Sequence, residues 1–171
     1  MNLDDLPPPE LMWRGKYVRA FKRANWEYAS RTDNIGAVVI LAEIDGNVIL
    51  VEQPRVPPDC RCVELPAGLV GDHDPAATVE STAVKELEEE TGFTTERIER
   101  LGDFYSSPGM LSEAFTLVRA HDLRKIGDGG GDANEDIKVH LVPRAEIPNF
   151  IEQKRAEGLG VDAKLLLFLN F

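Results

Sequence analysis

The sequence predicts an α/β domain in which a mixed sheet lies between helical layers. Three observations predict it: two apolar, β-branched runs joined by a turn, one segment with helical spacing, and the order of elements along the chain. Strands come first, one helix follows, and further strands precede the closing helical segments, which differs from repeated parallel βαβ units. The 171 residues, 43% of them hydrophobic, are enough for one packed domain and too few for two ordinary ones.

An N-terminal extension precedes this domain. Residues 16–31 mix aromatic and β-branched side chains with charges and show no helical stripe, so we expect two exposed antiparallel strands there. We therefore divide the chain into an extension at residues 1–34 and a main domain at residues 35–171.

The core of the sheet is expected at two apolar runs, residues 36–41 and 48–53. The turn-forming cluster of Asp45, Gly46 and Asn47 lies between them and predicts a hairpin. The other expected elements are strands at residues 61–66, 98–105, 114–120 and 137–142, a loop at 67–75, and helices at 145–157 and 162–169.

A further helix is expected to begin at Asp74, which would cap it, and to end before Gly92, which suits a left-handed terminator. Val79, Ala83 and Leu87 have the spacing of its buried stripe. Its opposite face is acidic.

Three carboxylates share that acidic face. Glu86, Glu89 and Glu90 stand at positions i, i+3 and i+4, while Glu88 points elsewhere. Like charges at this spacing cost only about 0.2–0.5 kcal/mol per pair on an exposed helix, so a solvated acidic face is one interpretation. The other is a site for a hard divalent cation such as Mg2+, which binds carboxylate oxygens and keeps positions for water or phosphate.

The charge balance excludes one class of function. The 30 acidic and 19 basic residues give a formal net charge of -11, opposite to that of a surface that binds nucleic-acid backbone, so we expect no nucleic-acid polymer as a partner. The sequence shows neither a signal-peptide pattern nor an apolar run near the roughly 18 residues of a membrane span. We therefore expect a cytoplasmic protein without membrane contact, in which Cys60 and Cys62 are free thiols.

The surroundings of the acidic face resemble those of a known family. Residues 64–68 are Glu-Leu-Pro-Ala-Gly, and residues 85–93 are Lys-Glu-Leu-Glu-Glu-Glu-Thr-Gly-Phe. The second stretch resembles the second half of the Nudix box, with Lys85 where the family usually has arginine. This resemblance implies an α/β/α sandwich around a mixed sheet, here preceded by N-terminal antiparallel strands. It also implies hydrolysis of a nucleoside diphosphate linked to another moiety, with Mg2+ or alternatively Mn2+.

The resemblance assigns roles to residues of the site. Glu86 and Glu90 would bind metal, Glu89 would be a further ligand or would contact metal-bound water in catalysis, and the backbone carbonyl of Ala67 would be another donor. Lys85 keeps the charge of the usual arginine but loses its planar fork, so its support of Glu86 would be looser.

The first glutamate of the box has no clear counterpart. Counting back from Glu86 places it on Ala77, whereas counting forward from Gly68 places it on Asp74, and the two counts differ by three positions. We infer an insertion in the loop before the helix, and Asp74 and Glu80 are both candidates for this role.

The flanking segments resemble the branch of the family that hydrolyses ADP-ribose and nucleotide sugars. They are residues 64–68, the proline-containing loop 16 residues after Gly92, and the aromatic residues of the extension. The implied reaction releases AMP, or another nucleoside monophosphate, together with a sugar phosphate. The resemblance also implies a homodimer. The substrate contacts that the resemblance implies are Arg55 at the diphosphate, Trp26 and Tyr17 stacked on the base, and Pro108, Gly109 and Met110 in the loop. The alternative is that the aromatic residues simply cover the sheet.

The general base is expected in a loop before a late strand. Glu135 is our first candidate and Asp136 our second, because both follow the glycine run at residues 129–131 and precede the strand at 137–142. Glycines would allow this loop to move, although an ordinary surface loop has the same composition.

Two alternative functions stay open. One is a Nudix hydrolase of dinucleotide polyphosphates or of another nucleotide conjugate. The other is a non-catalytic Nudix-fold module that senses a nucleotide, for which the departures at Lys85 and Ala77 are the argument.

Overall fold

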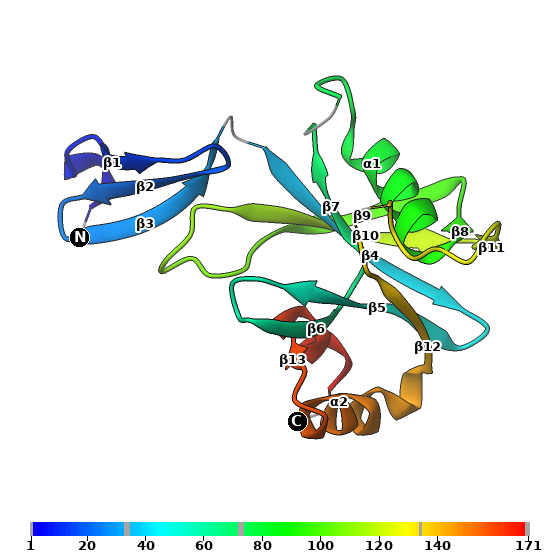
Figure 1. Cartoon of the computed structure of the whole chain (residues 1–171). Coiled ribbons are helices and arrows are strands. Elements are labelled where there is room, and N and C mark those ends of the chain that lie inside the picture. The colour runs from blue at the N-terminus through cyan, green and yellow to red at the C-terminus, as the bar shows by residue number, and fades with distance from the viewer. Residues whose placement is uncertain (1, 33–34, 72–73, 134, 170–171) are drawn as a thin grey trace.

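The computed structural model describes residues 2–32, 35–71, 74–133 and 135–169 of the chain (Figure 1). The strands are β1 (Glu10–Arg14), β2 (Val18–Arg23), β3 (Trp26–Arg31), β4 (Gly36–Ile44), β5 (Asn47–Arg55), β6 (Cys60–Glu64), β7 (Ala67–Val70), β8 (Phe93–Thr94), β9 (Arg97–Tyr105), β10 (Ala114–His121), β11 (Arg124–Lys125), β12 (Lys138–Pro143) and β13 (Gly160–Val161). The helices are α1 (Val79–Glu86), the π-helical turn η3 (Leu87–Thr91), α2 (Ile147–Ala156) and the 3-10 turns η1 (Leu3–Asp5), η4 (Arg144–Glu146) and η5 (Ala163–Phe168).

A mixed sheet forms the centre of the molecule. Its strands follow the order β13, β6, β5, β4, β10 and β9, with β12 also paired to β5 and β7 to β4. β10 runs parallel to β4 and β13 runs parallel to β6, whereas the other pairs are antiparallel. The predicted mixed sheet is therefore confirmed.

The predicted hairpin at β4 and β5 is present, but its two arms diverge. The strands pair only next to the turn, at Glu43 with Val48 and at Ile44 with Asn47. Beyond these rungs β4 pairs with β7 and β10, while β5 pairs with β6 and β12. The centre of the sheet therefore opens, which leaves room for a pocket between β4 and β6.

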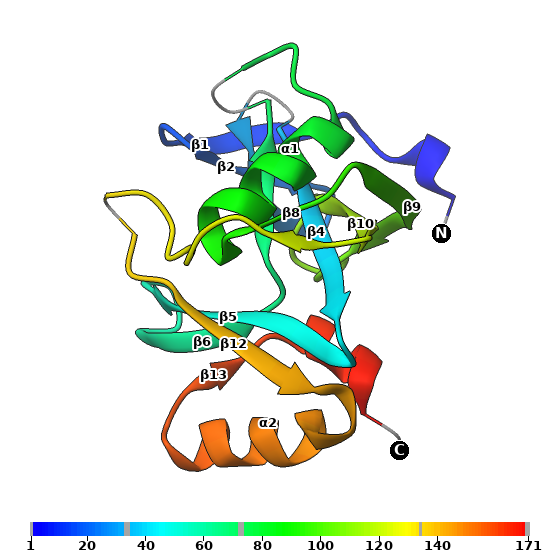
Figure 2. The same cartoon turned by 90° about the vertical axis from the view of Figure 1, so that its right-hand side faces the viewer.

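Alternate side chains of β4 pack against two different helical layers. Val38 lies in the core that contains Leu87, whereas its neighbour Val39 lies in the core that contains Ile151 of α2. Figure 2 shows α1 and α2 on opposite sides of the central strands. This arrangement confirms the sandwich. Within the described ranges, none of the helices is both long and apolar enough to cross a membrane.

The first helix begins later than the sequence predicts. Its N-terminal cap is Thr78, whose side chain accepts from the backbone N–H of Ser81, while the Ser81 hydroxyl accepts from the N–H of Thr78. Asp74 instead accepts from the N–H of Ala76 over 2.9 Å, in a turn before the helix. The reciprocal capping box competes successfully with the Asp-Pro signal because it satisfies two free N–H groups. Gly92 ends the helical segment at φ 72°, as predicted.

Two other expectations need correction. The predicted loop at 67–75 begins with strand β7, which pairs antiparallel with β4. The last predicted helix is the 3-10 turn η5. The two strands expected at residues 16–31 are present as β2 and β3, and β1 before them adds a third, paired with β2 although all of its residues are exposed.

The extension forms a sheet of its own. β1, β2 and β3 pair with each other, and Figure 1 shows them extending to the left of the main body. Backbone hydrogen bonds join this sheet to the body at Ala29, which donates to Met110 over 2.9 Å and accepts from Ser112 over 3.0 Å. The division of the chain at residue 34 stays a prediction, since residues 33–34 lie outside the described ranges.

Candidate active site

Glu90 is the most deeply buried carboxylate of the acidic face. It lies in the π-helical turn, is 3% exposed, and accepts a hydrogen bond from the backbone N–H of Ala67 over 3.1 Å. Burial, together with the nearby charges of Glu86 and Glu135, raises the pKa of Glu90 to about 8, although Ala67 and Arg55 act in the opposite direction. Four segments that are far apart in the sequence therefore meet at this side chain.

Glu86 lies directly against β7. A Cβ atom added to Gly68 would lie 2.2 Å from Cδ and 2.3 Å from Oε1 of Glu86, so only glycine leaves room for this side chain. Position 68 therefore has to be glycine if Glu86 is to keep this position. The Glu-Leu-Pro-Ala-Gly segment and the helical glutamates, which the resemblance assigns to one site, lie against each other in the fold.

Glu89 points differently from its two neighbours. Its Oε2 accepts from Nζ of Lys85 over 2.8 Å, and its side chain is 45% exposed. The hydrogen bond to Glu89 raises the pKa of Lys85. Lys85 therefore supports Glu89 through this hydrogen bond, whereas the resemblance led us to expect it at Glu86. Glu88 accepts from the hydroxyl of Thr94 and is separate from the cluster, as predicted.

The donor chemistry of this cluster fits a divalent cation. Within the described residues, no three His, Cys, Asp or Glu side chains already stand in metal-binding geometry. However, the buried carboxylate of Glu90 faces the charges of two further carboxylates, Glu86 and Glu135. A buried carboxylate among like charges is stabilised by a cation that several oxygens share. Glu86 and Glu90 are therefore the residues suited to hold a metal ion, with Glu89 within the same turn.

The glycine run is packed against the helical turn that carries Glu89 and Glu90. The N–H of Gly130 donates to the carbonyl of Glu90 and that of Gly131 to the carbonyl of Glu89, both over 2.9 Å. A Cβ atom on Gly129 would lie 2.4 Å from the Thr91 carbonyl carbon. Gly129 is thus needed for close backbone approach, and Gly129, Gly130 and Gly131 all adopt the positive φ that glycine allows.

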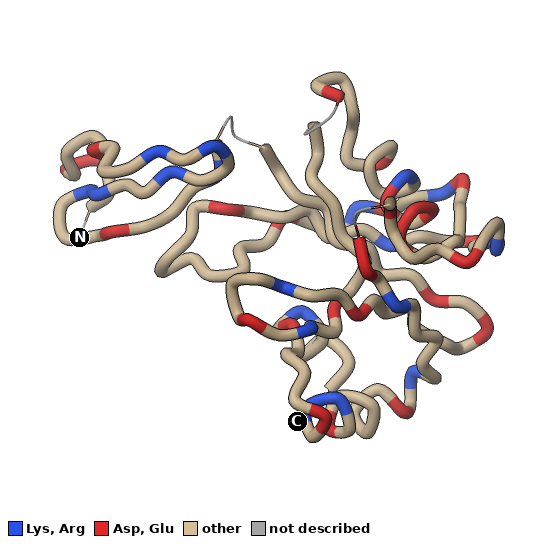
Figure 3. Tube along the Cα trace, in the orientation of Figure 1, with Lys and Arg blue, Asp and Glu red and all other residues tan. Residues whose placement is uncertain are grey.

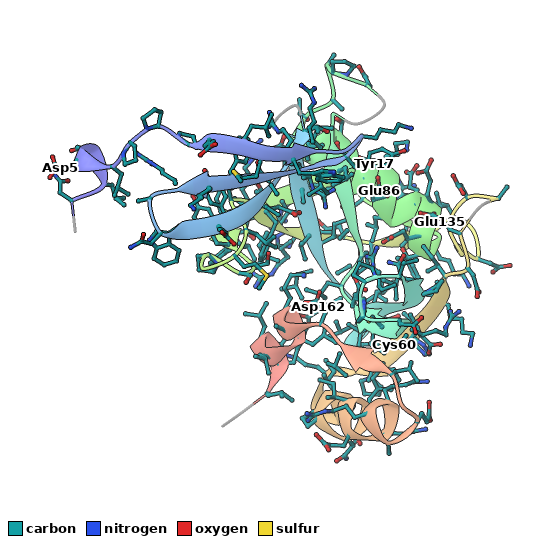
Figure 4. The ribbon with its side chains drawn as sticks, turned by 60° about the vertical axis from the view of Figure 1, so that its left-hand side comes forward. Asp5, Tyr17, Cys60, Glu86, Glu135 and Asp162 are labelled. Atoms are coloured by element: carbon teal, nitrogen blue, oxygen red, sulfur yellow. The ribbon has the colours of Figure 1, made fainter. Side chains whose placement is uncertain are left out.

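This packing brings Glu135 to the acidic face. Its Oε2 accepts from the N–H of Asp132 over 3.0 Å. Figure 4 shows Glu135 beside the green helical segment that carries Glu86, and Figure 3 shows the acidic residues of the helix and of the loop on the same side. The first candidate for the base therefore lies beside the acidic face, and its catalytic role stays a prediction.

Arg55 lines a pocket of about 680 Å3. Its Nε and Nη2 donate to the two carboxylate oxygens of Glu64, each over 2.7 Å, and this pair raises the pKa of Arg55. Ala67 and Gly68 line the same pocket. Arg55 thus lies at the edge of the carboxylate cluster, as a diphosphate contact would.

The pocket also contains residues that the sequence interpretation missed. They are Arg31 of β3, Phe115 of β10 and Lys164 of η5. Lys164 lies over the ring of Phe115 at 5.5 Å from its centroid. No local motif marks these residues, because they come from three distant segments that meet only in the folded chain.

The predicted base-binding residues lie elsewhere in this chain. Trp26, Pro108 and Gly109 line a second hollow of about 600 Å3, together with Tyr28 and Tyr105. Tyr17 is 61% and Met110 65% exposed, and neither lines the pockets described here. The structure therefore brings Ala67, Glu86, Glu90, Glu135 and Arg55 together and leaves the aromatic residues apart from them.

The two candidates for the first glutamate of the box are engaged elsewhere. Glu80 forms a forked ion pair with Arg100 of β9, at 2.6 and 3.2 Å, and this pair lowers the pKa of Glu80 to about 2. Asp74 is bonded to Ala76 in the turn before α1. Neither carboxylate is directed toward Glu90.

Known proteins of one family are similar to this chain. A NUDIX domain model matches residues 32–160. The chain is 40% identical over 121 residues to the ADP-ribose pyrophosphatase of Bacillus subtilis (strain 168), a match that covers 70% of this chain and 64%, less than two thirds, of that protein. It is 31% identical over 145 residues to the GDP-mannose pyrophosphatase of Cronobacter sakazakii (strain ATCC BAA-894), with 80% of this chain and 72% of that protein covered.

A solved crystal structure of an ADP compounds hydrolase has the same fold. The TM-score is 0.71 at 23% sequence identity, over 95% of this chain and 90% of that one. The fold and the carboxylate cluster beside β7 define the class: a Nudix-type α/β/α sandwich with N-terminal antiparallel strands. With the domain match across residues 32–160, the chain belongs to the Nudix family.

Proposed function

We propose that this protein is a Nudix pyrophosphohydrolase that cleaves the diphosphate of ADP-ribose, or of a related nucleoside diphosphate sugar, into a nucleoside monophosphate and a sugar phosphate. The observation that carries the proposal is the meeting of buried Glu90 with Glu86, Glu135 and the Ala67 backbone, beside a pocket that contains Arg55. The ADP-ribose and GDP-mannose pyrophosphatases among the relatives support this substrate class.

The carboxylate oxygens are suitable ligands for Mg2+, and Mn2+ is the alternative ion. Glu86 and Glu90 would hold the ion, with Glu89 and the carbonyl of Ala67 as further donors. Such an ion, when bound, polarises the diphosphate and acidifies a water molecule.

The chain's own residues have separate tasks. Glu135 accepts a proton from the attacking water, because it is the carboxylate that the loop brings to the acidic face. Arg55 binds a phosphate oxygen through Nη1, since Nε and Nη2 are engaged with Glu64. Glu64 in turn fixes the plane of the guanidinium.

We also propose that two copies of the chain share the site. The three-stranded extension carries exposed Trp13, Trp26 and Met12, at 59%, 48% and 56% exposure. A second copy covering this surface would bury apolar area and bring Trp26 and Tyr17 to the partner's pocket. A cytoplasmic location remains a prediction.

The deciding experiment is product analysis. The protein is incubated with Mg2+ and a panel of ADP-ribose, GDP-mannose and dinucleotide polyphosphates, and the products are separated by chromatography. We expect a nucleoside monophosphate and a sugar phosphate from a nucleotide sugar, with no activity in Glu90→Gln and normal activity in Glu152→Gln, an exposed carboxylate of α2. Cleavage of the dinucleotides alone would favour the second hydrolase function, and binding without any product would favour a sensing module.

A further inference from the structure

Asp136, the residue after the candidate base, is held by an arginine of a neighbouring strand. Nη1 of Arg61 donates to Oδ2 of Asp136 over 2.5 Å, and its Nη2 donates to the backbone carbonyl of Asp136 over 3.0 Å. Arg61 lies on β6, 75 positions away in the sequence. Its guanidinium thus binds both the side chain and the main chain of the segment that leads into β12.

The same guanidinium is fixed from the opposite side. Nε of Arg61 donates to Oε1 of Glu52 over 2.8 Å, and Nη2 also donates to the Glu52 carbonyl over 3.0 Å. The side chain of Glu52 is only 4% exposed. Arg61 is therefore a bridge between a buried carboxylate of β5 and the loop.

Glu52 is itself held in place by three further side chains. Lys138, His140 and Lys154 approach its carboxylate to 3.3, 3.1 and 3.2 Å. They come from β12 and α2, so the position of Glu52 depends on packing that does not involve the active site. A buried carboxylate with this many partners is a rigid anchor point.

The loop is thereby fastened at two places, on either side of Glu135. Upstream, Gly130 and Gly131 donate to the carbonyls of Glu90 and Glu89. Downstream, Arg61 binds Asp136. Between these attachments, the N–H of Asp132 donates to Oε2 of Glu135 over 3.0 Å, and the N–H of Ile137 donates to the carbonyl of Gly130 over 3.4 Å. Arg61 adds the contacts that hold the residue directly after Glu135.

We propose that Arg61 is a positioning residue, which holds Glu135 at the carboxylate cluster by joining Asp136 to the buried Glu52. This proposal rests on the proposed hydrolase function and adds to it a residue that touches neither metal nor substrate. It also assigns Asp136 a role as the anchor of the loop, with Glu135 as the base.

Three substitutions test the anchor. Asp136→Asn weakens the loop side of the bridge and leaves Arg61 paired with Glu52, so it does not disturb the buried charge. Arg61→Gln removes the bridge, and Arg61→Lys keeps the charge but lacks the planar fork that reaches both partners. Arg155→Gln is the matched control, because it removes an exposed ion pair with Glu152 on α2, far from the loop.

The first measurement is hydrogen exchange of the metal-free protein, followed by mass spectrometry. We expect peptides from residues 127–138 to exchange about tenfold faster in Asp136→Asn and Arg61→Gln, with an intermediate effect in Arg61→Lys and none in the control. Peptides from α2 should keep their rates in all variants. Unchanged exchange in the loop would overturn the proposal, whatever the activity.

The second measurement separates kcat from KM on a substrate that the wild type hydrolyses. We expect kcat to fall about tenfold while KM stays within about twofold, because a misplaced base slows the chemical step and leaves substrate contacts intact. The double variant Arg61→Gln with Asp136→Asn should fall no further than Arg61→Gln alone. Additive losses would overturn the positioning role. An unchanged kcat in a variant whose loop exchanges faster would overturn it as well.

These two readouts distinguish the two proposals. If the wild type hydrolyses no member of the panel, the proposed hydrolase function fails and the catalytic part of this inference fails with it. The exchange rates still decide whether Arg61 anchors the loop, because they require neither metal nor substrate.

Discussion

The backbone N–H of Ala67 donates to the carboxylate of Glu90 over 3.1 Å, and this bond joins β7 to the π-helical turn. It joins a strand to a helical segment that follows the loop in which we infer the insertion. π-helical turns often occur at functional sites, because the extra residue in the turn displaces a side chain from the regular helical face. Glu90 lies in this turn, and its side chain is buried.

Glu90→Gln should separate activity from stability. We expect turnover to fall at least about a hundredfold, because the variant loses a metal-binding oxygen with charge. The melting temperature of the metal-free protein should not fall, since a neutral amide is less costly to bury than a carboxylate and its oxygen can still accept from Ala67. Turnover assays and calorimetry without Mg2+ measure the two effects. A large loss of metal-free stability would contradict this account of Glu90.

Glu135→Gln should lower kcat at least about a hundredfold with little change in substrate affinity. The amide keeps the size of the side chain and cannot accept a proton at neutral pH. Single-turnover kinetics at saturating substrate measure the chemical step directly. Near-normal turnover would remove Glu135 from the mechanism and make Asp136 the candidate base.

Gly68→Ala should weaken metal binding by moving Glu86. The added methyl group would lie 2.2 Å from Cδ of Glu86, so this side chain has to leave its position beside β7. We expect a weaker affinity for Mn2+, measured by calorimetry, and a corresponding loss of activity. Gly36→Ala is the matched control, because an added Cβ at Gly36 meets no atom within 4 Å. Equal metal affinity in the two variants would contradict the predicted role of Glu86.

Glu52 should make the protein sensitive to acid. Burial raises the pKa of Glu52, but hydrogen bonds from Arg61, Lys154, Lys138 and His140 outweigh this and lower it to about 2, from 4.5 for the free side chain. Since the folded pKa is the lower one, the stabilisation is complete above pH 4.5 and is lost as the pH falls toward 2.

Urea unfolding of the wild type and of Glu52→Gln at several pH values measures this effect. We expect the difference in unfolding free energy between them to be largest at pH 7 and to shrink between pH 4.5 and 2. A difference that stays constant over this interval would show that Glu52 does not account for the acid sensitivity.

The shared site predicts a dimer that depends on the extension. We expect sedimentation to give about twice the 19.0 kDa mass of the chain. Trp26→Ala should raise KM for the nucleotide sugar more than it lowers kcat, because it removes a stacking contact to the base. Val56→Ala, at a side chain that is 90% exposed, is the control. A monomer at assay concentrations would remove Trp26 from the site.

The sequence alone determined the features that depend on local spacing. The spacing along the helical segment brought Glu86 and Glu90 together, although Glu89 points differently. Gly92 ended the helix, and the Asp45 to Asn47 cluster made the turn between the two central strands. Such features depend on neighbours within a few residues, so they can be predicted from the chain itself.

Only the tertiary structure decided which of these groups meet. The capping box at Thr78 leaves Asp74 in the turn before α1, and Glu80 is paired with Arg100 of β9. Both candidates for the first glutamate of the box are therefore engaged away from the site. The divergence of β4 and β5 opens the pocket that holds Arg55, and Arg61 meets Asp136 across 75 positions of sequence. These relationships arise from packing between distant segments, which spacing along the chain does not encode.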